Sequence, residues 1–241
     1  MSISSTIKQK IEQFEPGQVF DYGDIPVYQE APSAVVKAMS RLLKKGEIKR
    51  LSKGLFYKPK RGIFGELKPS DSELLKTILY KRGRLRGYIT GTALYNQLGL
   101  TTQLPRTITV AIQGGRQEKN FGTLRAKLVK SRAPVKAADV MILQYLDVLQ
   151  DINDIPDANA NETLVRMAKR FSKLDDKQVK RAKTLVCHFY TTKVVALTGL
   201  LLEYTGKDTT CRLKKSLNPL TRFKIGLDIK QWPECRDWNI R

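Results

Sequence analysis

The stretch from Pro32 to Pro59, PSAVVKAMSRLLKKGEIKRLSKGLFYKP, decides the fold of the N-terminal part of the chain. It begins with a proline, which suits the first turn of a helix. Val35, Met39 and Leu42 follow at helical spacing, and Gly46 suits the left-handed residue that ends a helix. The stretch therefore predicts a helix over residues 32–45 with one apolar face.

The second half of this stretch predicts a β-hairpin. Ile48–Leu51 has apolar residues at its two ends and two basic residues between them, and Leu55–Tyr57 is an apolar and aromatic run. They flank Ser52–Gly54, a turn that contains a glycine and a lysine. We therefore expect a hairpin with a basic tip directly after the helix.

The residues before the stretch predict three further elements. Residues 3–14 place Ile3, Ile7, Ile11 and Phe14 on one helical face. Gln18–Phe20 is long enough for one short strand, and Asp21 can cap a short helix that ends before Pro26. Helix, strand, short helix, basic helix and hairpin is the order of a winged helix-turn-helix. We expect residues 1–63 to form this DNA-binding domain.

The predicted DNA contacts fall into two groups. Short polar or basic side chains near the start of the second long helix suit base edges or their border in the major groove; these are Ser33, Lys37, Ser40 and Arg41. Basic side chains beside them suit the phosphate backbone; these are Lys44, Lys49, Arg50 and Lys53. A winged helix that contacts protein, with these charges merely solvated, is the alternative.

The charge of the whole chain favours a polyanionic partner. The sequence has 44 Lys and Arg residues against 23 Asp and Glu residues, which gives a formal net charge of +21. This exceeds the roughly 2 to 8 charges that solubility requires. Such an excess attracts nucleic acid through counterion release and steering. A generally solvated basic surface is the alternative.

The excess is not confined to the predicted winged helix. Residues 76–132 hold 12 basic residues and one acidic residue, whereas residues 136–162 are mostly acidic among their charges. The basic segment suggests a second basic surface, made of Arg82, Arg84, Arg86, Arg106, Arg116, Lys119, Arg125 and Lys127.

The rest of the chain predicts a larger mixed α/β domain over residues 64–206, which makes the fold class α+β. Its pattern predicts a small sheet and several helices. The strands are expected at 107–112 and 124–129, and the helices at 70–80, 91–98, 139–149, 162–174 and 194–202. If the helix that starts at 162 runs past Asp175 and Asp176, Lys169, Lys173, Lys177 and Lys180 form one basic stripe.

Residues 207–241 are expected to form a basic C-terminal extension. Trp232 and Trp238 are core anchors in one interpretation. In the other they belong to an aromatic and basic surface that stacks on single-stranded nucleic acid.

Catalytic and metal chemistry have little support in the sequence. The chain has one histidine, His188, and three widely spaced cysteines, Cys187, Cys211 and Cys235. This spacing fits neither a disulfide framework nor a zinc knuckle. We expect no metal, no cofactor and no enzymatic activity. Without an apolar stretch of about 20 residues or a signal-like start, we expect no membrane partner and a cytoplasmic location.

Three runs of the sequence resemble the AbiE-type antitoxins of bacterial abortive-infection toxin–antitoxin systems. Residues 39–48, MSRLLKKGEI, and 53–59, KGLFYKP, are similar to that family's winged helix. Residues 99–105, GLTTQLP, followed by an Ile/Val strand, resemble its second domain, and residues 193–203 are loosely similar to its closing helix.

The resemblance implies a function with two parts. The winged helix would bind double-stranded operator DNA and repress the toxin–antitoxin operon, which gives the DNA role to Ser33, Lys37, Ser40, Arg41, Lys44, Arg50 and Lys53. The larger C-terminal part would counteract a nucleotidyltransferase-like toxin without acting as an enzyme. A winged-helix regulator or plasmid-type replication protein without a toxin is the alternative.

Overall fold

The computed structural model describes residues 3–63, 65–207 and 211–241. The chain forms two compact units. Unit 1 comprises residues 1–86 and 119–125, and unit 2 comprises residues 87–118 and 126–241. The boundaries expected after residues 63 and 206 follow from sequence composition and stay predictions; residues 208–210 of the expected extension lie outside the described residues.

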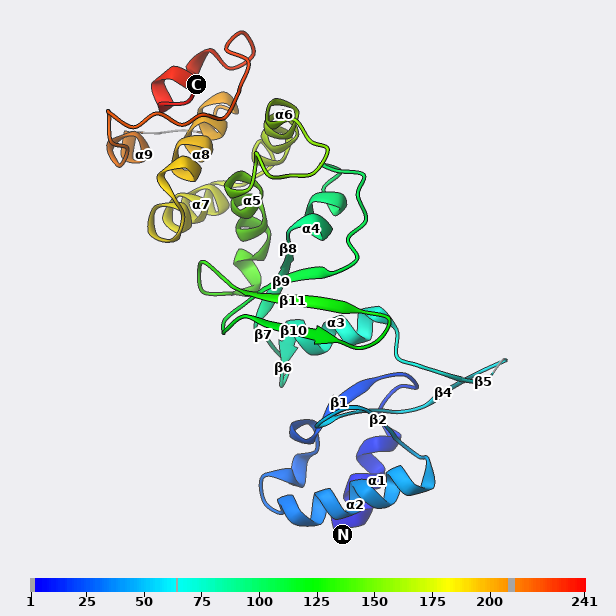
Figure 1. Cartoon of the computed structure of the whole chain (residues 1–241). Coiled ribbons are helices and arrows are strands. Elements are labelled where there is room, and N and C mark those ends of the chain that lie inside the picture. Colours follow the sequence, from blue (N-terminus) through cyan, green and yellow to red (C-terminus); the bar gives the residue numbers. More distant parts are fainter. Residues whose placement is uncertain (1–2, 64, 208–210) are drawn as a thin grey trace. The chain divides into compact units, whose positions relative to one another are not determined.

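Unit 1 begins with a helical and a sheet layer (Figure 1). Its first elements are α1 (Ile3–Glu12), β1 (Val19–Asp21), the 3₁₀ turns η1 (Tyr22–Asp24) and η2 (Pro26–Tyr28), α2 (Pro32–Lys45), β2 (Lys49–Ser52) and β3 (Leu55–Tyr57). The three strands form an antiparallel sheet in the order β1-β3-β2. The two long helices, the short strand, the capped short helix and the hairpin are confirmed at their predicted places.

Local chemistry explains these boundaries. Gly46 ends α2 in the left-handed region with φ 71°, and its N–H donates to the Leu42 and Leu43 carbonyls. The Asp21 carboxylate accepts from the N–H of Gly23 and forms a capping box with Asp24 at η1. Short polar side chains fix helix starts in this way. The short helix predicted after Asp21 is thus present, and it is a single 3₁₀ turn, η1.

The layers of unit 1 are joined by one apolar core. It contains Ile7, Ile11, Phe14, Phe20, Ile25, Val35, Ala38, Met39, Leu42, Ile48 and Phe56. Ile7, Val35, Met39, Ile48 and Phe56 are fully buried. The core therefore contains Val35, Met39 and Leu42 of the predicted α2 face and all of the predicted first helical face except Ile3, which is exposed.

Four strands and one helix complete unit 1. They are β4 (Lys60–Gly62), β5 (Gly65–Leu67), α3 (Asp71–Leu79), β6 (Tyr80–Lys81) and β7 (Arg84–Leu85). The β4–β5 and β6–β7 pairs are separate two-stranded ribbons. The helix is confirmed, with Ser70 as its N-cap, whereas neither ribbon was predicted.

Unit 2 is built on a small mixed sheet. Its order is β10-β11-β9-β8, with β8 (Gly87–Thr90), β9 (Ile108–Ile112), β10 (Gln117–Asn120) and β11 (Arg125–Lys130). β9 pairs with β11 in parallel and with β8 in antiparallel direction. The two predicted strands, β9 and β11, are confirmed; β8 and β10 were not predicted.

Helices make up the rest of unit 2. They are α4 (Thr92–Gln97), η3 (Ala137–Asp139), α5 (Val140–Gln150), α6 (Ala160–Phe171), α7 (Asp176–Phe189), α8 (Thr192–Tyr204), α9 (Cys211–Lys215) and η4 (Pro233–Trp238). Asp175 caps α7 and so separates it from α6. The conditional stripe of lysines from Lys169 to Lys180 therefore does not follow one helix.

α8 is the central helix of unit 2. Its residues from Val194 to Leu202 are all buried, as the apolar run predicts. It packs against α5, α6, α7 and η4. Mixed α+β architecture with small sheets and several helices is thus the fold class of the chain. None of the helices in the described part of the chain combines the length and apolar content that a membrane crossing requires.

The C-terminal segment is anchored to unit 2 by its two tryptophans, and both are fully buried. The Trp238 indole donates to Glu203 Oε2 at 2.6 Å, and the Trp232 indole donates to Asn161 Oδ1 at 2.9 Å. The interpretation as core anchors is confirmed. The alternative of an exposed stacking surface is wrong for these two residues.

Gly199 of α8 makes room for this anchor, because a Cβ atom there would overlap the six-membered ring of Trp238. We expect Gly199→Ala to lower the free energy of unfolding by about 1 to 3 kcal/mol, the usual cost of overpacking a core. Denaturant unfolding followed by tryptophan fluorescence measures this loss. Gly115→Ala, where a Cβ would meet open space, is the matched control. Equal stability of the two variants would contradict the close packing.

Candidate nucleic-acid interface

α2 presents opposite chemistry on its two faces. The buried face carries Val35, Ala38, Met39 and Leu42. The five predicted contact residues of the helix are all exposed, namely Ser33, Lys37, Ser40, Arg41 and Lys44. Because the first face is held in the core, the polar and basic face must point outward.

The start of α2 adds partial positive charge to this surface. Pro32 occupies the first turn, no side chain caps the helix, and its first turn has no acidic residue. The free N–H groups of a helix start attract anionic groups such as phosphates. The N-terminal half of α2 therefore combines short polar side chains with a favourable backbone field.

The β2–β3 hairpin carries the other predicted contacts, in three different environments. Lys53 is exposed in the turn beside Gly54, whose φ is 78°. Lys49 Nζ lies 3.2 Å from Glu66 Oε2, and the Arg50 guanidinium lies 5.9 Å from the centre of the Phe56 ring. Lys49 therefore contacts Glu66 and Arg50 contacts Phe56, and Lys53 takes part in neither contact.

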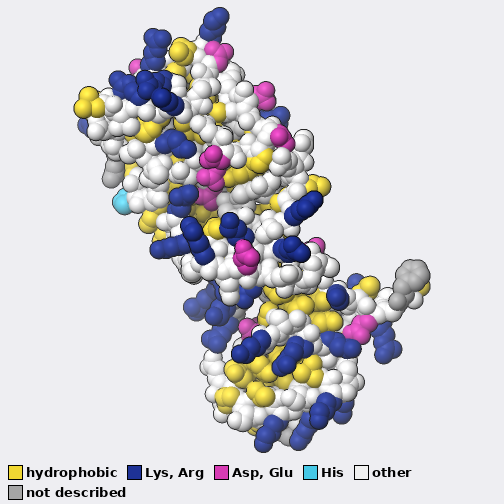
Figure 2. All heavy atoms as spheres, viewed as in Figure 1, with side chains coloured by type: hydrophobic (Ala, Val, Ile, Leu, Met, Phe, Trp, Pro, Cys, Tyr) yellow, Lys and Arg dark blue, Asp and Glu magenta, His cyan; other side chains and the backbone are white. Residues whose placement is uncertain are grey.

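The eight residues of the suggested second basic surface are divided between the two units. Figure 2 shows Lys and Arg side chains over much of the visible surface. Arg82, Arg84, Arg86, Lys119 and Arg125 belong to unit 1. Arg106, Arg116 and Lys127 belong to unit 2. Two hollows bring some of these residues together with cations that the sequence did not single out.

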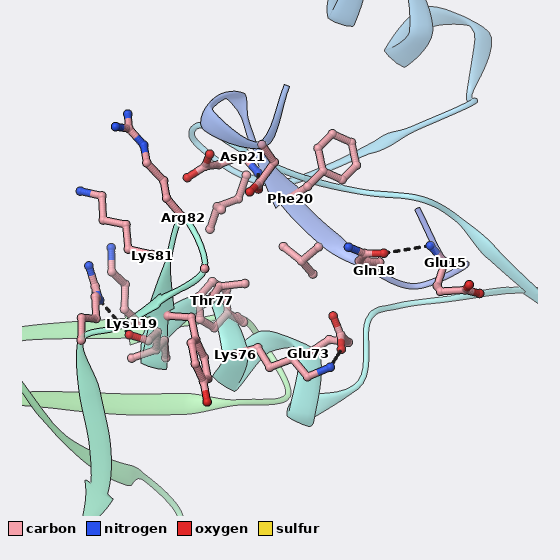
Figure 3. A pocket seen from close by; sticks show the side chains of 18 of the residues that line it. Glu15, Gln18, Phe20, Asp21, Glu73, Lys76, Thr77, Lys81, Arg82 and Lys119 are labelled. Carbon is pink, nitrogen blue, oxygen red and sulfur yellow. Dashed lines mark hydrogen bonds and ion pairs between the residues drawn. The ribbon is translucent and has the colours of Figure 1, made fainter. Parts of the chain in front are cut away.

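The first hollow, in unit 1, has a volume of about 600 Å³. Arg82, Arg86 and Lys119 line it together with Lys76 and Lys81. Figure 3 shows Lys81, Arg82 and Lys119 on one side of the hollow and residues of β1 on the other. Predicted and unpredicted cations therefore share this site.

Four acidic residues line this hollow, and two of them, Asp24 and Glu73, have local partners. Asp24 Oδ2 accepts from the Asp21 N–H at 2.8 Å, and Glu73 pairs with Lys76. Burial raises the pKa of the Asp24 carboxyl. Within the described residues Lys81 and Lys119 form no ion pair, so this side of the hollow can receive an anionic group.

Arg82 stands in the turn of the β6–β7 ribbon with φ 50°. A residue with a Cβ adopts this left-handed conformation at a cost of about 1 kcal/mol. The following residue is Gly83, with φ 71°, as such turns require. Arg82 is therefore held at the edge of the hollow in a conformation that glycine or asparagine would adopt more easily.

The second hollow, in unit 2, has a volume of about 330 Å³ and places Arg116 beside Lys130 and Arg132. Residues of β8, β9 and β11 and Asp147 of α5 also line it. Sequence reasoning did not identify this aspartate, because its neighbours in the chain are apolar.

Asp147 connects three elements of unit 2 through its buried carboxylate. Oδ2 accepts from the Thr90 hydroxyl at 2.9 Å and from the Tyr88 hydroxyl at 3.0 Å. Oδ1 accepts from the Tyr190 hydroxyl at 2.8 Å and lies 3.9 Å from Arg132 Nε. Burial raises the pKa of Asp147, against the opposing effect of these hydrogen bonds. The carboxylate therefore holds α5 to β8 and to Tyr190, the residue that follows α7.

The described residues contain no group of three or more His, Cys, Asp or Glu side chains that could hold a metal ion.

A family model described as a family of unknown function (DUF6088) matches residues 6–179. The chain belongs to this family. The DUF6088 match starts within α1 and ends within α7, so it includes α2, the β2–β3 hairpin and the residues that line both hollows. No curated protein matches the chain.

One solved structure with a comparable fold is the crystal structure of the RV2827C protein from Mycobacterium tuberculosis. The TM-score is 0.50 at 13% sequence identity, and the alignment covers 92% of this chain and 84% of that chain. At this identity the likeness concerns the fold alone. The DUF6088 chain thus shares its α+β arrangement with a bacterial protein over most of its length.

The Asp147 network predicts a pH-dependent stability. Because burial raises the pKa of Asp147, the folded chain binds this proton more tightly than the unfolded chain does. The contribution of this proton to stability is complete below about pH 3.9, the unfolded pKa, and is lost as the pH rises through the raised pKa. Asp147→Asn cannot ionise, so wild type should lose stability relative to this variant over that range. Denaturant unfolding at a series of pH values measures the difference, and a constant difference would contradict the burial effect.

Proposed function

We propose that this DUF6088 chain is a DNA-binding antitoxin and transcriptional repressor of a toxin–antitoxin operon, which acts by binding rather than by catalysis. The observation that carries the DNA-binding part is the outward face of α2, where five polar or basic side chains lie together on one exposed helix face. The antitoxin part rests on the resemblance of the sequence to the AbiE-type family.

The finer fold proposed for residues 1–63 is a winged helix-turn-helix, with α2 as recognition helix and the β2–β3 hairpin as wing. The order α1, β1, short turn, α2, β2, β3 and the antiparallel sheet support this proposal. A helix of this kind enters the major groove with its N-terminal residues against base edges. Ser33, Lys37, Ser40 and Arg41 suit that role, and Lys44 suits the adjacent phosphates.

The wing adds contacts of a different kind. Lys53 is exposed at its tip and suits a phosphate contact. Arg50 and Lys49 keep their positive charges near the DNA-facing surface, although each has a neighbour within unit 1. We therefore place the strongest wing contact at Lys53.

The toxin-directed part of the proposal concerns unit 2. The run from Gly99 to Pro105, which resembles the second domain of the antitoxin family, connects the end of α4 to β9. Gly99 has φ 67°, and Leu100 and Thr101 behind it are buried. This geometry indicates that the run helps to hold unit 2 together. The partner that we propose for unit 2 is a nucleotidyltransferase-like toxin.

Binding to duplex DNA from upstream of the chain's own reading frame should depend steeply on salt, with a log–log slope of about 0.9 per neutralised phosphate. The double variant Arg41→Ala/Lys53→Ala should bind this duplex more weakly. Its salt slope should fall by about 1 for each phosphate contact that is lost. Fluorescence anisotropy titrations at several salt concentrations measure both quantities.

Lys230→Ala/Arg236→Ala removes the same charges from exposed positions of unit 2 and is the matched control. It should retain the affinity and slope of wild type if α2 and the wing hold the DNA. If both double variants lost the same affinity for DNA, α2 and the wing would contribute only through the net charge of the chain and not as a specific interface. Full affinity in the Arg41→Ala/Lys53→Ala variant would move the interface elsewhere.

The antitoxin part is tested by growth. Co-expression of the full chain should rescue cells from the product of the adjacent reading frame, if that frame encodes a nucleotidyltransferase-like protein. The Arg41→Ala/Lys53→Ala variant should rescue equally well, because its substitutions lie outside unit 2. Failure of the wild-type chain to rescue would leave a winged-helix regulator without a toxin, which is the alternative function.

A further inference from the structure

Among the described residues of the β4–β5 ribbon in unit 1, the large apolar side chains are exposed. Ile63, in the turn between the strands, is 97% exposed, and Leu67 on β5 is 47% exposed. Every described residue of the two strands except Gly62 is exposed, and Gly62 is half-buried. In Figure 1 the ribbon extends away from the other elements of unit 1.

A two-stranded ribbon of this length has little stability by itself. Its register joins only three residue pairs, from Lys60 with Leu67 to Gly62 with Gly65. An isolated two-stranded hairpin is at best marginally stable in water and gains stability by packing on another surface. The described residues supply little such surface, so an external partner would complete its packing.

The turn also departs from ordinary turn chemistry. Tight hairpin turns favour Asn, Asp and Gly, whose backbones tolerate the turn and whose side chains suit water. Here the first turn residue is an isoleucine between Gly62 and the next residues of the loop. A single exposed apolar side chain is unremarkable on a flat surface. At the tip of a ribbon, however, the Ile63 side chain can reach into a narrow groove of a partner.

The charges around Ile63 favour one class of partner. Lys60 and Arg61 on β4 and Lys68 after β5 are exposed. The acidic residue of the ribbon, Glu66, is paired with Lys49 of β2 at 3.2 Å. The ribbon therefore offers positive charge beside an apolar tip, and its ion pair joins it to the strand of the proposed wing.

We infer that the β4–β5 ribbon is a second DNA-contacting arm, which inserts Ile63 between base pairs from the minor groove while Lys60 and Arg61 hold the flanking phosphates. Ile is among the side chains that proteins use as minor-groove wedges, and basic residues accompany them. The inference rests on the proposed DNA-binding function. Flexible pyrimidine–purine steps are the expected insertion sites, because they unstack most easily.

Permanganate oxidation tests the wedge without knowledge of the operator, because it modifies unstacked thymines. The flexible TA and CA/TG steps each contain a thymine on at least one strand. The probe is the duplex that precedes the chain's own reading frame, incubated with the full chain. Wild type should create reactive thymines within the region that it protects. Ile63→Ser should remove that reactivity and weaken binding by about tenfold, the scale of one buried apolar side chain.

Leu220→Ser is the matched control, since Leu220 is 90% exposed in unit 2 and stands outside the ribbon. It should retain both the reactive thymines and the wild-type affinity. Ile63→Ser should melt at the wild-type temperature, because its side chain makes no buried contact. A change in the mass of Ile63→Ser in solution, measured by light scattering, would instead make the ribbon a contact between copies and overturn the inference.

The experiments distinguish failure of the proposed DNA-binding function from failure of the second DNA-contacting arm. If wild type does not bind the duplex at all, the DNA-binding function fails and the arm falls with it. If wild type binds and Arg41→Ala/Lys53→Ala weakens binding, but Ile63→Ser changes neither thymine reactivity nor affinity, only the arm is refuted.

Discussion

The burial of one face of α2 is the constraint on which the proposed interface depends. Val35 and Met39 are fully buried against Ile7, Phe20 and Phe56, which come from α1 and the β1-β3-β2 sheet. Rotating α2 to bury its other face would place Lys37 and Arg41 in that core, and burial of unpaired charges is prohibitively costly. The packing of five apolar side chains therefore fixes which side chains can reach a partner.

Unit 2 uses a different device to hold its elements together. The central helix α8, buried from Val194 to Leu202, accepts the Trp238 ring at Gly199, and the buried Asp147 carboxylate holds α5 to β8 and to Tyr190. Both are interactions between residues far apart in the sequence. Arg116 and Lys130 line a hollow in the same unit, together with Asp147.

The sequence predicts those parts of the fold that depend on local signals. The helical spacing of the apolar residues predicts α2, and Gly46 predicts where it ends. The separation of α6 from α7 depends on Asp175 acting as a cap, which the sequence left open. β10 and the two ribbons were missed because their short strands contain many charged residues or glycines, and such strands are defined by pairing rather than by local preference. β8 contains Tyr88, Ile89 and Thr90, which favour a strand, but it is only four residues long and was missed for that reason.

The candidate sites divide in the same way. The exposed face of α2 follows from helical spacing, so Ser33, Lys37, Ser40, Arg41 and Lys44 could be chosen without coordinates. The hollow lined by Arg82 and Lys119 could not, because 37 positions separate these residues in the sequence and only the tertiary fold joins them. Asp147 carries no local signal, because its role depends on hydroxyl groups from β8 and from the segment before α8.

A photocrosslinking amino acid at position 40 tests the central claim most directly, because Ser40 lies on the exposed face of α2. The same group at Asp154, an exposed position in the acidic segment of unit 2, serves as reference. We predict that irradiation of the complex with the upstream duplex joins the DNA to position 40 and leaves position 154 unlinked. Crosslinking at position 154 with none at position 40 would contradict the assignment of α2 as the DNA-binding helix.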